Sequence, residues 1–131
     1  MNDVMTMNPF INIDDKENAG KRRNLTHFQD YLGEYTATEL IKVFGEPVFK
    51  DSEGDFGDGK TKLEWCIKFD YEDPDGDWHG GVFFIYDWKN YRMDELDLYN
   101  TKVNWHIGGR GLSYDAIRCF KDEFQFLMEG E

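Results

Sequence analysis

The stretch that decides the fold is Lys62-Leu-Glu-Trp-Cys-Ile-Lys-Phe-Asp-Tyr71, followed by Glu72-Asp-Pro-Asp-Gly-Asp77 and then by Trp78-His-Gly-Gly-Val-Phe-Phe-Ile-Tyr-Asp-Trp88. In the first segment apolar side chains alternate with polar ones, a period of two residues that predicts a strand with one buried face. The middle segment has Pro and Gly at positions typical of a turn. The third segment contains an unbroken apolar run at 82–86, as expected for a central strand covered on both faces. The stretch therefore predicts an antiparallel hairpin in the middle of a sheet.

Helices are predicted on both sides of this hairpin. Before it, Thr36 stands three residues ahead of Glu39, which is a capping box, and Gly45 occupies the usual stop position, so a helix is expected at 36–44. After it, Ser113 is a good N-cap for a last helix. The apolar residues of that helix recur at helical spacing and form a core-facing stripe: Ala116, Ile117, Phe120, Phe124 and Leu127. Further strands are expected to begin at Val48 and to run over 102–107.

The order of helix, strands and helix indicates an α+β fold. We expect a single domain in which an antiparallel sheet of about four strands carries the N-terminal and the C-terminal helix on one face. Residues 31–131 make up this compact domain. Residues 1–30 are predicted to be a flexible N-terminal arm, with one short strand at Phe10, Ile11 and Ile13. The basic cluster Lys21-Arg22-Arg23 is interpreted as part of a loop in that arm.

The net charge of −12, from 27 acidic and 15 basic residues, restricts the classes of partner. Direct binding to nucleic acid is not expected, because contacts to the phosphate backbone require Lys and Arg. Docking on an anionic membrane is disfavoured for the same reason, and no apolar stretch is long enough to span a bilayer. Without a visible signal sequence the protein is expected in the cytoplasm, with Cys66 and Cys119 as free thiols; a disulfide between them is the alternative. Solubility is the simplest role for the charge itself.

The acidic residues are concentrated in one part of the chain. Residues 51–100 contain fourteen acidic residues against five basic ones, a local net charge of −9. Carboxylates spaced over a hairpin can imitate phosphates, so we predict a surface that docks on the basic surface of a nucleic-acid-binding protein. Aromatic residues and an arginine after the hairpin are candidate anchors. The predicted partner-binding residues are Asp70, Glu72, Asp73, Asp75, Asp77, Trp88, Tyr91, Arg92, Asp94, Glu95 and Asp97.

Metal binding and catalysis receive less support from the sequence. An EF-hand starting at Asp51 would need Gly where Phe56 stands and Glu where Lys62 stands, and no zinc spacing is present, so no metal site and no cofactor is predicted. A metal-dependent hydrolase using the carboxylates of 70–77 is the weakest alternative. His106 could act as a general base oriented by Asp87, but no serine or cysteine can be placed beside it, so no catalytic residue is predicted.

An alternative function concerns the turn Gly108-Gly-Arg-Gly111, which precedes the last predicted helix. Backbone amides and the helix dipole favour an anion there, and Arg110 could hold phosphate or carboxylate through two hydrogen bonds. The spacing matches neither a P-loop nor a dinucleotide-binding motif, and glycines are also needed simply to turn the chain. The alternative is a small-ligand binder, oligomeric where that completes a pocket, that sequesters a nucleotide-like signal. Its ligand-binding residues would be His106, Gly108, Gly109 and Arg110.

Four blocks in series resemble a pattern found in small uncharacterised proteins of tailed bacteriophages: Phe44-Gly-Glu-Pro47, Glu64-Trp-Cys-Ile-Lys-Phe69, Phe84-Ile-Tyr-Asp-Trp-Lys89 and Trp105-His-Ile-Gly-Gly109. The resemblance covers about residues 30–120, and the chain departs from the pattern in its longer acidic loops and its N-terminal arm. It implies an accessory protein made inside a bacterium and brings no assigned catalytic residues. Small acidic phage proteins often inhibit restriction enzymes, CRISPR effectors or DNA-repair enzymes. The leading prediction is therefore a non-enzymatic anti-defence inhibitor with an acidic, DNA-mimicking surface.

Overall fold

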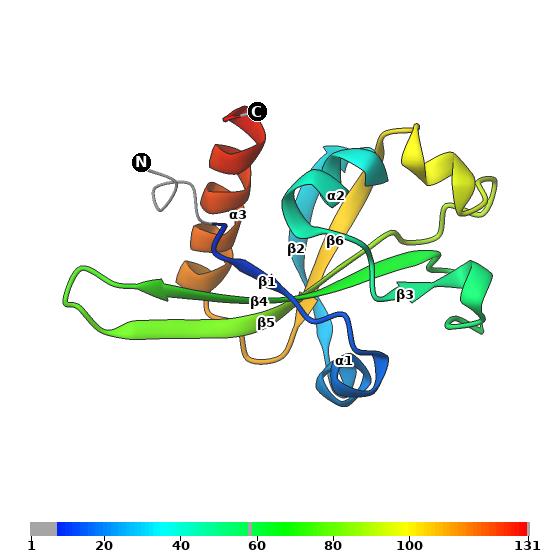
Figure 1. The fold of residues 1–131 in the computed structure, drawn as a ribbon. Coiled ribbons are helices and arrows are strands. Elements are labelled where there is room, and N and C mark those ends of the chain that lie inside the picture. Colours follow the sequence, from blue (N-terminus) through cyan, green and yellow to red (C-terminus); the bar gives the residue numbers. More distant parts are fainter. Residues whose placement is uncertain (1–7, 58, 131) are drawn as a thin grey trace.

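The computed structural model describes residues 8–57 and 59–130, which form one antiparallel sheet with helices on both faces (Figure 1). The strands are β1 (Phe10–Asn12), β2 (His27–Tyr35), β3 (Phe49–Lys50), β4 (Leu63–Glu72), β5 (Trp78–Tyr86) and β6 (Val103–Gly109). The helices are α1 (Lys16–Arg23), α2 (Ala37–Phe44) and α3 (Tyr114–Glu129), and two short 3₁₀ turns, η2 (Asp51–Glu53) and η3 (Leu96–Tyr99), lie in loops. The strand order is β1-β4-β5-β6-β2, and β3 pairs with β4 outside this path.

The predicted hairpin is confirmed and lies in the middle of the sheet. β4 and β5 pair without interruption, from Glu64 opposite Tyr86 to Glu72 opposite Trp78. The predicted helix starts are confirmed as well. Thr36 forms the capping box of α2, and Ser113 caps α3 by accepting a hydrogen bond from a backbone N–H at 3.0 Å.

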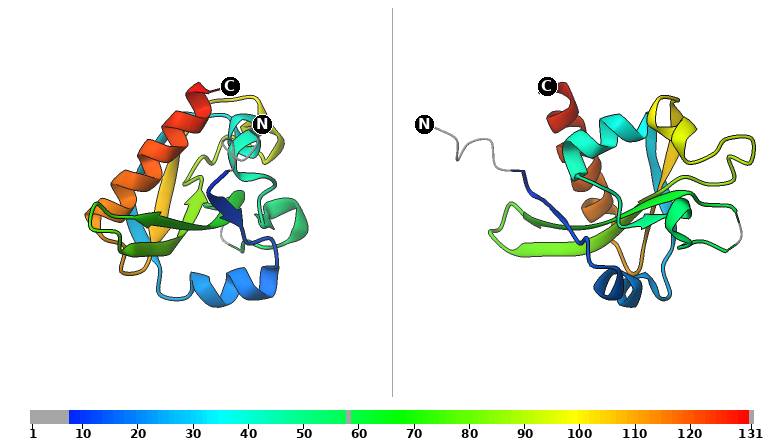
Figure 2. Two further views of the ribbon diagram at one scale, coloured as in Figure 1. Left: turned by 60° about the vertical axis from the view of Figure 1, so that its left-hand side comes forward. Right: turned by 45° about the vertical axis from the view of Figure 1, so that its right-hand side comes forward.

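The larger core lies between the sheet and the helices α2 and α3 (Figure 2). Alternate residues of the three central strands point into it: Leu63, Trp65, Ile67, Phe69, Phe83, Ile85, Val103, Trp105 and Ile107. Phe120 of α3 is fully buried among aromatic rings, and its ring centroid lies 4.2 Å from that of Phe83 and 5.8 Å from that of Phe44. Because rings from both layers interlock here, this face of the sheet is closed.

The opposite face of the sheet is only partly covered. α1 packs there, below the sheet in Figure 1, and buries Ala19 in a small cluster with Cys66 and Phe84. Val48 and Phe49 complete that cluster. Since α1 has only eight residues, it covers the part of the face next to β3 and β4 and leaves the neighbouring part open.

The predicted fold class is wrong in the size of the sheet and in the order of the helices. The sheet has six strands instead of about four, and β1, α1 and β2 all precede α2. α1 also lies on the face opposite α2 and α3, so the helices do not share one face. These early elements fall largely within the predicted arm, of which residues 1–7 lie outside the described part of the chain.

Two properties of the sequence conceal these elements. α1 has a single buried residue, Ala19, so it lacks the apolar stripe by which helices are recognised, although Asp15 caps it. β2 is an edge strand paired with β6, and its register shifts between Phe28 and Asp30 and again between Tyr31 and Gly33. Each shift interrupts the alternation that would otherwise predict a strand.

Candidate ligand-binding cleft

An open cleft occupies the part of the sheet that α1 leaves uncovered. Its volume is about 940 Å³, which lies within the range of small-molecule sites, roughly 300–1,000 Å³. The floor is formed by Glu64 of β4, Tyr86 of β5, and His106 and Gly108 of β6. The walls are lined by Arg23, Thr26, His27, Phe28, Tyr31, Asp55, Phe56, Gly57, Thr61 and Trp88.

The strand register brings the residues of the floor together. Glu64 pairs with Tyr86, Tyr86 pairs with His106, and His106 pairs with Tyr31, so the four residues form one row across β4, β5, β6 and β2. Gly108 follows His106 on the same face, and a Cβ atom at Gly108 would lie 3.0 Å from Cε1 of Tyr86. Glycine at this position therefore leaves room for the Tyr86 ring beside the strand.

Glu64 is a buried carboxylate on this floor, with only 7 % of its surface exposed. Burial raises the pKa of Glu64 to about 7, although Arg23, whose Nε lies 3.5 Å from Glu64 Oε1, acts in the opposite direction. A buried charge is costly unless it is paired, and the single arginine offsets that cost only in part. Near neutral pH the group can therefore accept hydrogen bonds as a carboxylate or donate one as an acid.

Arg23 is held at the cleft by two aromatic rings. Its guanidinium carbon lies 4.3 Å from the ring centroid of Phe49 and 5.5 Å from that of Phe56, both within cation–π range. Phe56 belongs to the loop that follows η2, so Arg23 joins the end of α1 to this loop. A guanidinium has five N–H donors, so Arg23 can pair with Glu64 and still offer donors to a ligand in the cleft.

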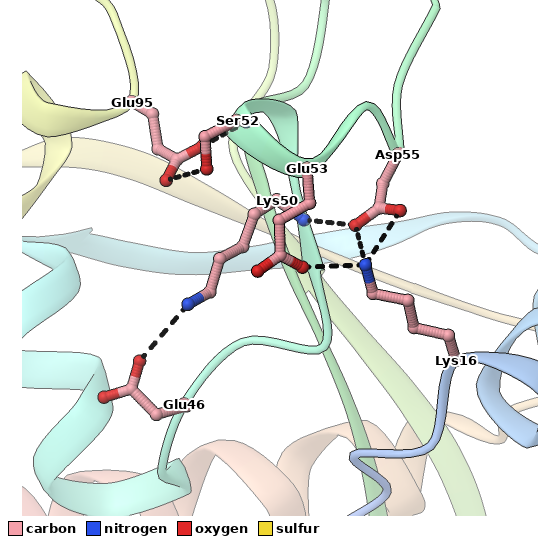
Figure 3. A network of polar contacts seen from close by, with 7 residues as sticks. All are labelled: Lys16, Glu46, Lys50, Ser52, Glu53, Asp55 and Glu95. Atoms are coloured by element: carbon pink, nitrogen blue, oxygen red, sulfur yellow. Dashed lines mark hydrogen bonds and ion pairs between the residues drawn. The ribbon is translucent and has the colours of Figure 1, made fainter.

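The loop wall is tied to the start of α1 by charged groups (Figure 3). Nζ of Lys16 lies 2.7 Å from Glu53 Oε1 and 2.9 Å from Asp55 Oδ2. Asp55 also accepts the backbone N–H of Lys50 at 2.9 Å. Although burial opposes the change, the hydrogen bonds from Lys16 and Lys50 lower the pKa of Asp55. The charge of this acidic loop is thus partly neutralised by Lys16 of α1, and the loop forms a wall of the cleft.

Aromatic rings surround His106. Its ring centroid lies 5.2 Å from Phe28, 5.0 Å from Tyr31 and 5.4 Å from Tyr86. Burial lowers the pKa of His106 and raises the pKa of Tyr86 to about 12, so both groups are neutral at pH 7. Phe28 and Tyr31 are each 48 % exposed, and Trp88 is 39 % exposed. These rings present accessible faces on which a flat molecule can stack.

Among the residues that the structure describes, the cleft offers binding groups but no activated nucleophile. In the described part of the chain no hydrogen bond joins His106 to a serine, a cysteine or a carboxylate. Asp87, the predicted orienting partner of His106, is instead fully buried and accepts the backbone N–H groups of Lys62 and Leu63 at 2.8 and 2.9 Å. Cys66 is fully buried near α1, and burial raises the pKa of its thiol to about 12.

Two residues with an unusual backbone conformation flank the cleft. Leu25 has φ 63° and Lys89 has φ 59°, and no other non-glycine residue within 8–57 and 59–130 has a positive φ. Leu25 precedes Thr26 and Lys89 follows Trp88, and both of those neighbours line the cleft. Such conformations cost of order 1 kcal/mol or more and cluster at functional sites, so they draw attention to the same part of the molecule.

The four residues predicted to bind a ligand near 108–111 are divided by the structure. His106 and Gly108 line the cleft, whereas Arg110 lines a smaller cavity beside it. Gly109 packs under Leu112, with which a Cβ atom at this position would collide. The glycine turn therefore has a packing role, and the ligand-binding candidates lie on the face of the sheet next to it.

The residues predicted to bind a partner protein lie at opposite ends of the β4–β5 hairpin (Figure 1). Asp70, Glu72, Asp73, Asp75 and Asp77 belong to its free end, and Trp88, Tyr91, Arg92, Asp94, Glu95 and Asp97 follow the other end. At about 3.3 Å per residue, Glu64 and Glu72 at the two ends of β4 are roughly 26 Å apart. The predicted residues therefore form two separate surfaces.

At the free end of the hairpin, the carboxylate of Asp73 stabilises the turn. Asp73 accepts the backbone N–H groups of Asp75 and Asp77, each at 2.9 Å, and lies 2.7 Å from Nε2 of His79. The hydrogen bond from His79 is the main cause of the lowered pKa of Asp73. Of the tip residues, Asp75 and Asp77 are thus better placed than Asp73 to meet a partner.

At the other end, the acidic side chains also make local bonds. Asp94 and Asp97 accept each other's backbone N–H at 3.0 Å, and Glu95 accepts the N–H and the hydroxyl of Ser52 at 2.7 and 3.0 Å (Figure 3). Over the residues that the structure describes, no group of three or more His, Cys, Asp or Glu side chains could hold a metal ion. Cys66 and Cys119 are free thiols that pack in different clusters.

Sequence reasoning did not select five residues that form the cleft: Arg23, Phe28, Tyr31, Glu64 and Tyr86. The alternation of β4 correctly places Glu64 on the face opposite the large core. Its neighbour Tyr86, however, ends an unbroken apolar run, which indicated that this second face was also covered. Arg23, Phe28 and Tyr31 come from α1 and β2, two elements that were not predicted.

None of the described helices is long and apolar enough to cross a membrane. The resemblance to small phage proteins stays a prediction, and the cleft is defined by its geometry alone. No protein-family model, no curated protein and no solved structure matches the chain.

Proposed function

We propose that this protein binds a small planar molecule in the cleft and acts by holding it, without chemical conversion. The observation that carries the proposal is the row of Glu64, Tyr86, His106 and Tyr31 across four neighbouring strands, which lines an open cleft beside α1. A face that an antiparallel sheet leaves open to solvent usually carries exposed polar side chains. Here it carries a buried acid, a neutral imidazole and exposed rings instead.

The chemistry of the lining favours a flat heterocycle with hydrogen-bonding edges. Phe28, Tyr31 and Trp88 offer ring faces for stacking, each worth about 0.5–1.5 kcal/mol beyond the area it buries. Glu64 and His106 can donate or accept hydrogen bonds without a full charge, so they can fix the orientation of an uncharged ring. Such a cleft supports the ligand-binding alternative, with its site moved from the 108–111 turn to the face of the sheet.

The proposal is tested by looking for a bound molecule and by titration. Protein purified after expression in bacteria is denatured, and released small molecules are identified by mass spectrometry. Nucleosides, nucleotides and other heteroaromatic compounds are then titrated while tryptophan fluorescence is recorded. Trp88 lines the cleft, whereas Trp78 at the hairpin tip is 68 % exposed. Trp88→Phe should therefore remove the ligand-dependent signal, and Trp78→Phe should keep it.

Two cleft substitutions extend this test. We expect Glu64→Gln and His106→Ala to weaken binding about tenfold or more, which corresponds to about 1.4 kcal/mol. Circular dichroism of each variant checks that it is folded. The proposal fails if no compound is retained or bound, or if every bound compound keeps its affinity in both variants.

A second candidate function is binding of a host protein with a basic surface at the free end of the hairpin, as in the predicted anti-defence inhibitor. The observation that favours it is the projection of the hairpin beyond α3 (Figure 1), with acidic residues and the exposed Trp78 at its tip. Asp75→Asn with Asp77→Asn should slow association with a partner isolated from lysate, most clearly at low salt. Asp14→Asn with Glu17→Gln is the matched control, because both residues are exposed and lie before or in α1, outside the predicted partner-binding set. Equal association rates for all variants would contradict this candidate.

A further inference from the structure

A second, smaller cavity adjoins the cleft. Its volume is about 150 Å³, and it is lined by Arg22, Thr26, Val82 and Arg110. Thr26 lines the cleft as well, so the two cavities meet at this residue. The backbone there is held in place, because the Thr26 hydroxyl donates to the carbonyl of Arg23 at 2.8 Å.

Arg22 and Arg110 line this cavity without a carboxylate partner. Nε of Arg22 donates to Asn18 Oδ1 at 3.1 Å, and neither arginine forms an ion pair with a residue in 8–57 or 59–130. Arg23 and Arg118, by contrast, do pair with carboxylates. In a chain with 27 acidic and 15 basic residues, two arginines that share a cavity but no acid are unusual. Like charges at one cavity repel, and an anion between them would relieve that repulsion.

The position of Arg22 has another explanation that does not extend to Arg110. Arg22 stands in the last turn of α1, where basic side chains interact favourably with the C-terminal end of the helix dipole. Arg110 follows β6, on a different element, and has no helix end of this kind to stabilise. The helix dipole therefore does not account for the convergence of the two arginines on one cavity.

We infer that the smaller cavity is an anion subsite and that the ligand of the cleft is a nucleotide, with its base among the aromatic rings and its phosphate between Arg22 and Arg110. This inference rests on the proposed function and names the class of ligand. Guanidinium groups bind phosphate oxygens through paired hydrogen bonds, and Arg is the usual residue where that geometry is needed. A single phosphate is compact enough for the small cavity, while the cleft has room for a base and its sugar.

The test is isothermal titration of the full-length protein with the four ribonucleoside 5′-monophosphates, the four matching nucleosides and inorganic phosphate. At least one monophosphate should bind ten times more tightly than its nucleoside. Arg110→Ala and Arg22→Ala should each remove most of that difference while leaving nucleoside affinity unchanged. Arg92→Ala is the matched control, because Arg92 is also exposed and forms no ion pair with a described residue, but it lies outside both cavities.

Each other outcome separates the two proposals. Equal affinity for nucleoside and monophosphate would overturn the anion subsite and leave the cleft as a binding site. Another outcome is that inorganic phosphate binds as tightly as the monophosphates, and that the monophosphates keep the same affinity in Glu64→Gln and His106→Ala. That result would overturn the inference that one nucleotide occupies both cavities. If no nucleotide or nucleoside binds, the inference is wrong; a different compound retained in the cleft would then still support the proposed function.

Discussion

The face of the sheet that packs on α2 and α3 buries most of its side chains, whereas the face that carries α1 leaves an open cleft lined by an acid, an imidazole and several rings. Both faces are built from the same strands, since Trp65 and Glu64, or Trp105 and His106, are adjacent residues that point to opposite sides. The difference between the faces comes from the helices that cover them. α3 has sixteen residues with an apolar stripe, while α1 has eight residues and one buried side chain.

This comparison separates residues that hold the fold from residues that serve the cleft. On the closed face, removing a side chain leaves a cavity that the packed neighbours cannot fill. On the open face, the rings of Phe28 and Tyr31 are about half exposed, so their removal should change the binding surface more than the stability. Substitutions of similar size on the two faces should therefore have different effects on unfolding.

The largest difference is expected between two phenylalanines. Phe120→Ala should lower the free energy of unfolding by about 3–5 kcal/mol, because Phe120 is fully buried and stacks on Phe83. Phe28→Ala should lower it by about 1 kcal/mol or less, because Phe28 is 48 % exposed. Urea denaturation measures both values. Equal losses for the two variants would show that the face under α1 is packed as tightly as the other.

The closed face could be predicted from the sequence, because its apolar side chains recur at the spacing of a strand or a helix. Alternation in 62–71, the apolar run at 82–86 and the stripe of the last helix all point to the same core. The open face could not, because it depends on long-range pairing. Tyr31 reaches His106 only through β2, whose bulges conceal its pattern, and Arg23 reaches Glu64 only because a polar helix packs on the sheet. His106 and Gly108, two of the predicted ligand-binding residues, line the cleft, but they lie in β6 and not in the turn for which they were chosen.

The second prediction concerns pH. The pKa of Glu64 in the folded protein is about 7, above its ordinary value of 4.5, so the folded protein holds this proton more tightly than the unfolded chain. The resulting stabilisation is complete below pH 4.5 and is lost as the pH rises through 7. At 1.36 kcal/mol per pH unit, the full change is roughly 3 kcal/mol.

Glu64→Gln isolates this contribution. His106, whose pKa is lowered by burial, acts in the opposite direction at pH values below its ordinary 6.5, and both proteins retain it. The difference in unfolding free energy between wild type and variant should therefore change steadily from pH 4.5 to 7.5, in favour of the variant at high pH. A difference that is constant with pH would show that Glu64 keeps an ordinary pKa. Urea titrations at several pH values provide the measurement.

A smaller effect is expected at Asp87, which is fully buried and follows the last residue of β5. One of its oxygens accepts the N–H groups of both Lys62 and Leu63. Asp87→Ala would leave two buried donors without a partner and should cost about 2 kcal/mol or more. Asp87→Asn retains an oxygen in the same place and should cost less. If both variants lose the same stability, the carboxylate charge matters more than the two hydrogen bonds.

The smallest predicted effect tests the rim of the cleft. Leu25 has φ 63° and is 63 % exposed, so its side chain gains little from burial while its backbone is strained. Asn adopts this left-handed conformation more readily than Leu, and Leu25→Asn should therefore raise the unfolding free energy by roughly 0.5 kcal/mol. Leu96→Asn is the control, because Leu96 is 74 % exposed and has no positive φ. A higher unfolding free energy for Leu25→Asn, with no change for Leu96→Asn, would show that the backbone is strained beside Thr26, where the cleft and the smaller cavity meet. Equal small changes at both positions would mean that the turn is relaxed, and the rim would then give no support to a functional site.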